Sequence, residues 1–162
     1  MPVDSWEWIP GKSVGPFQLG AEANAVIDRF ALRKLETAYP NADSDTYEIP
    51  GHESWISTED DTISSINCWD RLDYKNADIL TLSLDEARAL LGPEEESEPL
   101  GETALMAVYY HSLGLTLWIE DGWIKSATCE ECSNADPIFQ ILPENLWGKA
   151  MQSEKRRAFR NN

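Results

Sequence analysis

The residues of this sequence best suited to metal or redox chemistry are two cysteines in a C-x-x-C spacing, Cys129 and Cys132. A zinc site needs four ligands, and the remaining cysteine and histidines form no second close pair: Cys68, His52 and His111. A redox C-x-x-C opens a helix, whereas this one follows a predicted strand. We therefore predict ordinary reduced thiols and no metal, with a metal or redox role for Cys129 and Cys132 as the alternative.

A phosphate-binding loop is suggested by Gly11-Lys12-Ser13, which matches the end of the pattern G-x-x-x-x-G-K-S/T. The first glycine of that pattern would stand at position 6, which is Trp6. Without that glycine and a preceding buried strand, backbone N–H groups cannot surround a phosphate. The segment is therefore predicted to be a turn, and we expect no bound nucleotide.

Hydrolytic chemistry would have to use the two histidines or the many carboxylates. Neither His52 nor His111 adjoins a nucleophile motif such as G-x-S-x-G, and no segment has the alternating ligands of a calcium loop. Adjacent acids such as Asp60 and Asp61 carry little weight in a chain with 29 acidic residues. We expect no catalytic residue, no cofactor and no enzymatic activity. The alternative is a small enzyme or ligand-binding protein with a pocket lined by His111, Trp118 and carboxylates.

The charge of the chain favours a basic partner. Its 29 acidic and 13 basic residues give a net charge of −16, and residues 149–162 carry +4, so residues 1–148 carry −20. Such a surface repels nucleic acid and attracts a basic protein, although acidity can also serve solubility alone. No apolar run is long enough to span a membrane, and the acidic N-terminus lacks the basic start of a signal peptide. We expect a cytoplasmic protein that binds neither nucleic acid nor membrane.

The chain resembles itself at an offset of 61 residues. The identical pairs that join the two predicted halves are Leu19 and Leu80, Glu59 and Glu120, Asp60 and Asp121, Ile63 and Ile124, Ser65 and Ser126, and Cys68 and Cys129. One offset without gaps aligns a helix pattern, a turn and a strand in the same order. An internal duplication is therefore predicted.

Each half is predicted to form a β-α-β-β-β module. The first half should hold a strand at 14–19, a helix at 22–35 and strands at 46–49, 54–58 and 62–68. The second should hold a strand at 78–82, a helix from Ser83 to Gly92 and strands at 104–111, 114–119 and 123–129. Ser83 and Glu86 form a capping-box pattern, and Asp121-Gly122 is a strong hairpin signal. The predicted fold class is α+β, with antiparallel sheets and helices packed on one face.

Residues 1–148 are expected to form one domain, made of two repeats at about 9–70 and 71–131 and a packed C-terminal segment. The segment 92–101, with four glutamates and two prolines, is predicted to be a solvated loop. The apolar residues of 137–148 are expected to pack on the body, and the basic tail 149–162 is expected to be flexible.

Tryptophans beside acids are the expected anchors for a partner, because Trp is favoured in protein interfaces. Trp55, Trp69, Trp118 and Trp123 lie in or beside predicted strands, although the same pattern fits strands that alternate between core and solvent. Acids at the two hairpins form one expected patch, and acids at the opposite strand ends form a second. The expected partner-binding residues are Glu59, Asp60, Asp61, Asp70, Asp73, Trp118, Glu120, Asp121, Glu130 and Glu131.

The chain resembles two-repeat bacterial immunity-like proteins, the immunity proteins of polymorphic-toxin and contact-dependent inhibition systems. Val14 to Gly20 matches their opening, G-P-hydrophobic-x-L-G before a helix. The stretches 79–92, 113–115 and 120–126 match their second half, and the likeness covers about residues 9–130. Thr81 replaces the usual glycine of the second half, and Asp61 stands where glycine is common. The matching positions are structural and include no catalytic signature.

This resemblance implies a partner that protects the cell from a secreted toxin. Together with the charge, it predicts an inhibitor that binds and neutralises a cognate basic toxin domain, such as a nuclease, with carboxylates in place of the substrate phosphates. A scaffold or envelope-assembly module is a further alternative, because the module also resembles the small outer-membrane assembly lipoproteins.

Overall fold

The computed structural model describes residues 2–36 and 44–132. These residues adopt a mixed α+β fold of mostly antiparallel strands with two α-helices. The elements follow in this order: β1 (Trp8–Ile9), β2 (Ser13–Val14), β3 (Phe17–Gln18), α1 (Asn24–Phe30), β4 (Arg33–Lys34), β5 (Ser44–Glu48), β6 (Trp55–Glu59), β7 (Thr62–Cys68), β8 (Asp73–Tyr74), β9 (Ala77–Asp78), the 3-10 helix η1 (Ile79–Thr81), α2 (Leu84–Leu91), β10 (Glu96–Pro99), β11 (Leu105–Tyr110), the 3-10 helix η2 (His111–Leu113), β12 (Leu115–Glu120) and β13 (Trp123–Cys129). All belong to one unit, Met1–Cys132.

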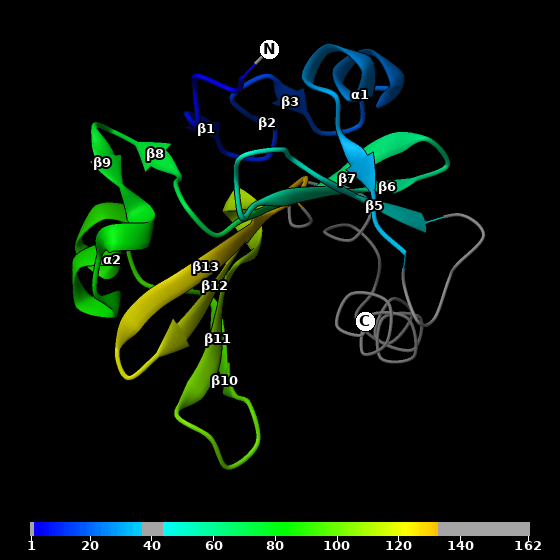
Figure 1. Cartoon of the computed structure of the whole chain (residues 1–162). Helices are drawn as coiled ribbons and strands as arrows, with labels where there is room; N and C mark the ends of the chain where they lie inside the picture. The colour runs from blue at the N-terminus through cyan, green and yellow to red at the C-terminus, as the bar shows by residue number, and fades with distance from the viewer. Residues whose placement is uncertain (1, 37–43, 133–162) are drawn as a thin grey trace, which may run out of the picture. The chain divides into compact units, whose positions relative to one another are not determined.

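An eight-stranded sheet forms the centre of this unit, in the order β10-β11-β12-β13-β7-β6-β5-β4 (Figure 1). Buried and partly exposed residues alternate along β6 and β12. A bulge interrupts this alternation in β7 and β13, whose inward residues Ile63, Ile66, Ile124 and Ala127 are buried, so one sheet face meets the core. Phe30 of α1, Ala87 of α2 and Trp8 of β1 belong to the same core cluster as the inward residues of the sheet. Both helices and the small sheet of β1, β2 and β3 therefore cover one face of the large sheet.

The two halves of the large sheet share several backbone details. Bulges, isolated bridges and helix-to-turn hydrogen bonds all recur with a separation of 61 residues. The recurring pairs are the bulges at Ser57/Thr58 and Trp118/Ile119, the bridges from Glu22 to Thr62 and from Ser83 to Trp123, and the N–H bonds from Ala23 to Asp61 and from Leu84 to Gly122. Each helix is thus tied to the hairpin that follows it by an equivalent backbone bond.

Several predicted elements are confirmed. The last strand of each half has the predicted bounds, 62–68 and 123–129, and each closes a hairpin with the strand before it. The capping box of the second helix is also present, because the Ser83 hydroxyl accepts from the Glu86 N–H and the Glu86 carboxylate accepts from the Ser83 N–H at 2.9 Å. These local signals were sufficient to predict the elements that position the two hairpins.

Other predicted elements differ. The first helix ends at Phe30, not 35, because Ala31 adopts a left-handed conformation with φ of 53°. The predicted strand at 14–19 is instead the short pair β2 and β3, with Gly15 in the turn between them. The predicted strand at 78–82 is β9 followed by η1, whose first N–H groups are capped by Asp78.

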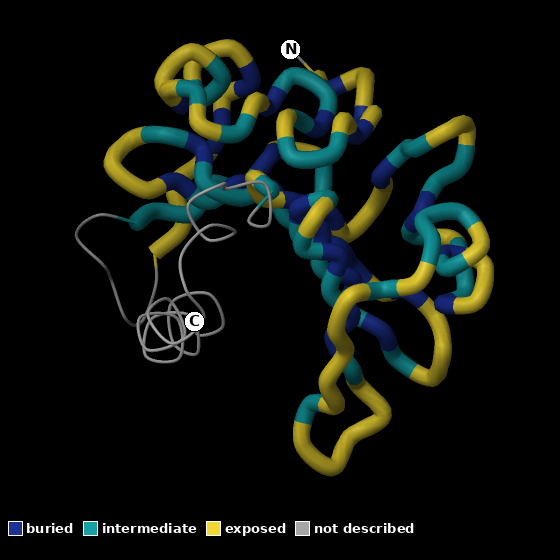
Figure 2. The backbone as a smooth tube through the Cα atoms, turned by 180° about the vertical axis from the view of Figure 1, so that it is seen from behind, coloured by how far each residue is buried: buried dark blue, intermediate teal, exposed yellow. Residues whose placement is uncertain are grey.

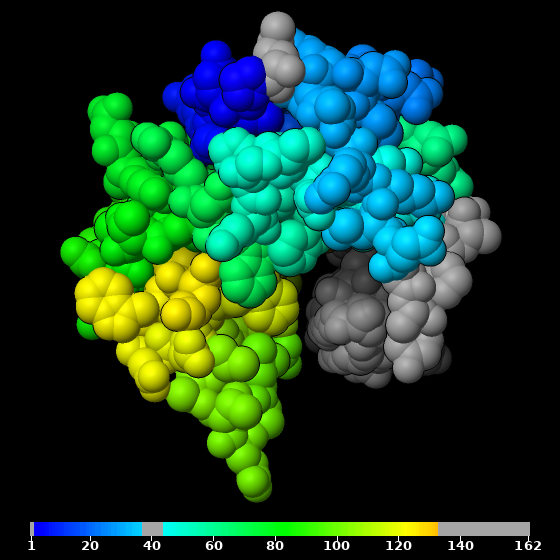
Figure 3. Space-filling view, viewed as in Figure 1, coloured from blue at the N-terminus to red at the C-terminus, as the bar shows by residue number. Residues whose placement is uncertain are grey.

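The segment 92–101, predicted to be a loop, contains strand β10, which pairs with β11 at one edge of the large sheet. Its residues are exposed (Figure 2), and its glutamates and proline suit a sheet edge that must resist pairing with another chain. The β10–β11 hairpin projects from the rest of the unit (Figure 3). The segments 137–148 and 149–162 lie outside the described residues.

Candidate functional site

The acidic charge of the unit is only partly neutralised from within. Residues 1–132 contain 26 acidic and 8 basic residues, a net charge of −18. Among the described residues, at least five of those bases already pair with acids: Arg33 with Glu48, Lys34 with Asp45, Arg71 with Asp73, Arg88 with Glu94, and Lys125 with Glu120. Most of the excess negative charge therefore faces solvent.

One part of this charge gathers at the β6–β7 turn. Glu59, Asp60 and Asp61 are exposed there. Because Cys129 is paired with Ile66 and β13 runs antiparallel to β7, the chain after Cys129 continues toward this turn and brings Glu130 and Glu131 with it. These five residues are called the turn cluster below. The turn cluster therefore combines acids from both expected patches, the patch at the hairpins and the patch at the opposite strand ends.

The pKa of Glu130 reflects its place in the turn cluster. Glu130 is exposed, but the protein around its carboxyl group partly desolvates it and raises its pKa. The negative charge of Glu59 raises this pKa further, and His111 lowers it. The carboxyl groups of Glu59 and Glu130, from opposite halves of the chain, are therefore close enough to repel one another.

The second hairpin is not part of the turn cluster. Glu120 and Asp121 lie at the beginning of β13, whereas Glu130 follows its end. The Glu120 carboxylate pairs with Lys125 at 3.4 Å, and Asp121 is exposed in the turn with φ of 52°. The two hairpins, expected to form one patch, therefore lie at opposite ends of β13.

Asp70 belongs to a hydrogen-bonded group with His52 and Ser54. The His52 Nδ1 lies 2.7 Å from Asp70 Oδ2, and the Ser54 hydroxyl donates to Asp70 Oδ1. Burial alone would raise the pKa of Asp70, but these hydrogen bonds and the charge of His52 lower it below its ordinary value. No catalytic triad results, because the serine proton points to the carboxylate and not to the imidazole. The group instead ties the turn before β6 to the chain that follows β7.

Asp73 is also occupied by an internal partner, because its two carboxylate oxygens share the N–H of Arg71 Nε, each at 2.9 Å. His111 Nε2 lies 2.9 Å from Glu96 and the ring stacks on Tyr109 with centroids 5.4 Å apart. Among the described residues, no group of three or more histidine, cysteine, aspartate or glutamate side chains is arranged to hold a metal ion.

The cysteines occupy positions that suppress thiolate chemistry. Cys68 and Cys129 are buried, and Cys132 is half-buried. Burial, followed by contact with Cys68, raises the pKa of Cys129 well above its ordinary value, and burial also raises the pKa of Cys132. The thiolate is the reactive form of cysteine, so these environments suit structural thiols.

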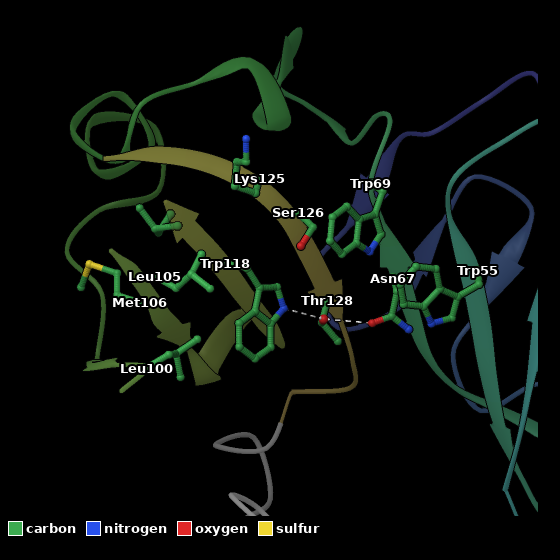
Figure 4. Close-up of a pocket in the computed structure, with 11 residues that line it drawn as sticks. Trp55, Asn67, Trp69, Leu100, Leu105, Met106, Trp118, Lys125, Ser126 and Thr128 are labelled. Atoms are coloured by element: carbon green, nitrogen blue, oxygen red, sulfur yellow. Dashed lines mark hydrogen bonds between the residues drawn. The ribbon is translucent and has the colours of Figure 1, made fainter. Parts of the chain in front are cut away.

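A groove of about 340 Å³ lies on the sheet face opposite the core (Figure 4). Its walls come from Trp55, Trp69 and Trp118, from Leu100 of the β10–β11 loop, and from Leu105 and Met106 of β11. The Trp118 Nε1 donates to the Thr128 hydroxyl at 3.0 Å, which donates in turn to the Asn67 Oδ1 at 3.0 Å. Trp55 and Trp69 stack with ring centroids 5.9 Å apart. These contacts hold the rings in place.

Trp55, Trp69 and Trp118 of the groove are among the tryptophans expected as anchors, although only Trp118 is in the set of expected partner-binding residues. Trp123, which also drew notice in the sequence, is 56% exposed at the tip of its hairpin and does not line the groove. The cross-strand pair of Trp55 with Asn67, and of Asn67 with Thr128, places the missed residues on one face. The register between β7 and β13 was the missing signal, because no turn joins these two strands.

Comparisons with known proteins add the fold alone. No family model matches the sequence, and no curated protein matches it significantly. Among solved structures, the chain is similar to a DUF4309 family protein, YjgB, from Bacillus subtilis, with a TM-score of 0.52 at 14% sequence identity over 75% of this chain and 88% of that chain. In the described part of the chain, neither helix has the length and apolar character that crossing a membrane requires.

Proposed function

We propose that this chain acts by binding another protein, as an immunity-type inhibitor of a cognate basic toxin domain such as a nuclease. The observation that carries the proposal is the turn cluster, where Glu59, Asp60, Asp61, Glu130 and Glu131 concentrate negative charge on a unit that already has a net charge of −18. The likeness of the sequence to two-repeat immunity-like proteins supports the same function.

The physical basis is electrostatic complementarity. A basic nuclease surface is built to bind phosphates, and a dense group of carboxylates offers it a similar array of negative acceptors. Opposite potentials speed the encounter of two proteins and exclude partners of like charge. The same field disfavours nucleic acid and anionic membranes as partners of this chain, and a cytoplasmic location suits a protein that meets the toxin inside the protected cell.

We also infer that the unit arose by duplication into two tandem modules, at about 9–70 and 71–131. The recurrence of bulges, bridges and helix-to-turn bonds at one spacing supports this inference. Duplication gives the protein two acidic hairpins, and the pairing of β7 with β13 places the end of the second module beside the hairpin of the first.

The proposal is tested by first recovering the partner from the native host by pull-down and mass spectrometry, and then measuring association rates. The test variant carries Glu59→Gln, Asp60→Asn and Asp61→Asn, because Asn tolerates the left-handed backbone of the turn. The matched control carries Asp4→Asn, Glu7→Asn and Glu102→Gln, which change the net charge equally at exposed positions elsewhere.

At low ionic strength we expect the turn variant to associate about tenfold more slowly than the control, with a flatter dependence on salt. Equal rates for the two variants would show that the turn cluster has no special role. Recovery of a nucleic acid or a small metabolite as the stable companion, with no basic protein, would count against the immunity function itself.

If the chain were instead a small enzyme or ligand-binding protein, we would expect a pocket lined by His111, Trp118 and carboxylates. The groove contains Trp118, but His111 and carboxylates are absent from its described lining. We therefore favour binding over catalysis.

A further inference from the structure

The groove beside Trp118 offers a guest almost no hydrogen-bonding partner. The indole N–H of Trp118 is satisfied by Thr128, and the Thr128 proton is satisfied by Asn67. Asn67, Lys125 and Ser126 also line the groove, but most of its described lining is apolar: three indole rings, Leu100, Leu105, Met106 and Ile119 (Figure 4). A sugar or nucleotide placed here would leave its own polar groups unpaired, which is costly. The groove therefore selects an apolar guest.

The size of the groove suits a side chain better than a large cofactor. Its volume of about 340 Å³ lies at the lower end of the range for sites that bind small molecules. Trp69 and Leu105 on its walls are 45% and 38% exposed, although both are large and apolar. Exposed aromatic and aliphatic groups around a depression are typical of the centre of a protein interface.

The charges around the groove indicate which residues should lie beside the bound apolar side chain in the partner. Glu120 is paired across the sheet with Leu105, and Glu98 is paired with Ala107, which is paired in turn with Trp118. Directly paired residues project from the same face of a sheet, so both carboxylates lie on the groove side. Lys125, the one base in the described lining, offsets the charge of its partner Glu120, so the net negative charge beside the groove comes from Glu98. An apolar floor beside carboxylates complements an apolar residue with Lys or Arg beside it, and an Arg there can also stack on an indole face.

We propose that the groove takes an apolar side chain, such as Leu or Phe, carried by an extended basic segment of the partner protein. This inference rests on the proposed function and deepens it: the turn cluster steers the basic partner, and the groove supplies the anchor that slows dissociation. Interfaces commonly divide these tasks, because rim charges act mainly on association rates and buried aromatic contacts act mainly on dissociation.

The test uses a synthetic peptide with one Leu between two Lys-Arg pairs, titrated against the whole protein by calorimetry and tryptophan fluorescence. One comparison peptide replaces the Leu by Ala, and another replaces the Lys-Arg pairs by Glu. The protein variants are Trp69→Ala and Leu105→Ala in the groove, and Ile9→Ala as the control, since Ile9 is an exposed apolar residue of β1, in the small sheet that covers the other face.

Trp69→Ala and Leu105→Ala should each weaken binding of the Leu peptide about tenfold, the effect of removing an interface anchor, while Ile9→Ala should change it less than about twofold. The Ala peptide should bind about tenfold more weakly, and the Glu peptide should not bind measurably. Equal binding of the Leu and Ala peptides, or unchanged binding by both groove variants, would overturn the proposal. Tighter binding of an uncharged fatty-acid ester than of the Leu peptide would also overturn it, in favour of a small-ligand site.

The two proposals fail separately. If the recovered toxin depends on the turn cluster and not on Trp69 or Leu105, the immunity function stands and the groove assignment falls. If the peptide binds as expected and no basic toxin is recovered, the groove assignment stands and the immunity function falls.

Discussion

The ion pair of Arg88 with Glu94 offers a quantitative test of how the β10–β11 hairpin is attached to the rest of the unit. Arg88 lies in the last turn of α2, and its Nε and Nη2 donate to the two oxygens of Glu94 at 2.8 and 2.7 Å. Glu94 lies just before β10, whose loop carries groove residue Leu100. The perturbation is Glu94→Gln, which keeps the shape of the side chain and removes its charge.

The size of the effect follows from the pKa of Glu94. Hydrogen bonds from Arg88 lower this pKa from an ordinary 4.5 to about 2, despite the opposing effect of burial. A shift of about 2.5 units corresponds to roughly 3.4 kcal/mol of folding free energy. Arg88 is 40% exposed and Glu94 is 13% exposed, so solvent screens the pair and we discount this value to about 1–2 kcal/mol.

The direction of the pH dependence is also determined. Because the pKa of Glu94 is lower in the folded protein, the ion pair stabilises the fold fully above about pH 4.5 and loses this contribution as the pH falls toward 2. The free energy of unfolding should therefore differ between wild type and Glu94→Gln by about 1–2 kcal/mol at pH 7, and the difference should shrink toward zero at low pH.

The measurement is urea unfolding followed by tryptophan fluorescence at several pH values, for wild type, Glu94→Gln and the control Glu102→Gln, which alters an exposed loop residue. The other acids titrate alike in the three proteins. Their contribution therefore cancels when the free energies of unfolding are compared at each pH. A difference that stays constant from pH 7 to low pH, or a Glu102→Gln variant that matches Glu94→Gln, would show that the ion pair of Arg88 with Glu94 does not stabilise the fold.

Two further predictions concern local backbone structure. Ser83→Ala should lower the free energy of unfolding by about 1 kcal/mol in the same urea assay, because it removes the acceptor for the Glu86 N–H at the start of α2; an unchanged midpoint would show that the cap is replaced by solvent. Asp61→Gly should raise that free energy by about 0.5–1 kcal/mol, because Asp61 has φ of 63° and glycine adopts this conformation without strain; the result that would contradict it is destabilisation.

Local sequence signals predicted the parts of this fold that depend on neighbouring residues. The Asp121-Gly122 turn and the alternation of residues 123–129 determine a hairpin within a dozen residues, and the Ser83 box determines where α2 begins. The end of α1 could not be predicted this way. Ala31 adopts a left-handed conformation, which Ala rarely favours on its own, so the surrounding packing must impose it. Similarly, β10 is a strand because β11 is beside it, and its own composition favours a loop.

The candidate site was harder to predict because it depends on a contact between the two halves. The pairing of β7 with β13 joins strands more than 50 residues apart, with no turn to set their register. That register decides that Glu130 and Glu131 join Glu59, Asp60 and Asp61, while Glu120 and Asp121 are left at the other end of β13. The sequence shows how many acids there are, but the register of β7 with β13 decides which of them lie close together.

The two hairpin turns differ in the residue at their second position, and this difference concerns the reason for the acidity of the chain. Asp121-Gly122 uses glycine at the second turn position, with φ of 82°, whereas Asp60-Asp61 places an aspartate there with φ of 63°. Aspartate costs stability in this conformation and adds a third carboxylate beside Glu59 and Asp60. If acidity served only solubility, an exposed position without strain would serve equally well, and glycine would be the better choice at position 61. Under the proposed function the Asp61 carboxylate contributes to partner binding, so Asp61→Gly should stabilise the protein and slow its association with that partner at low salt.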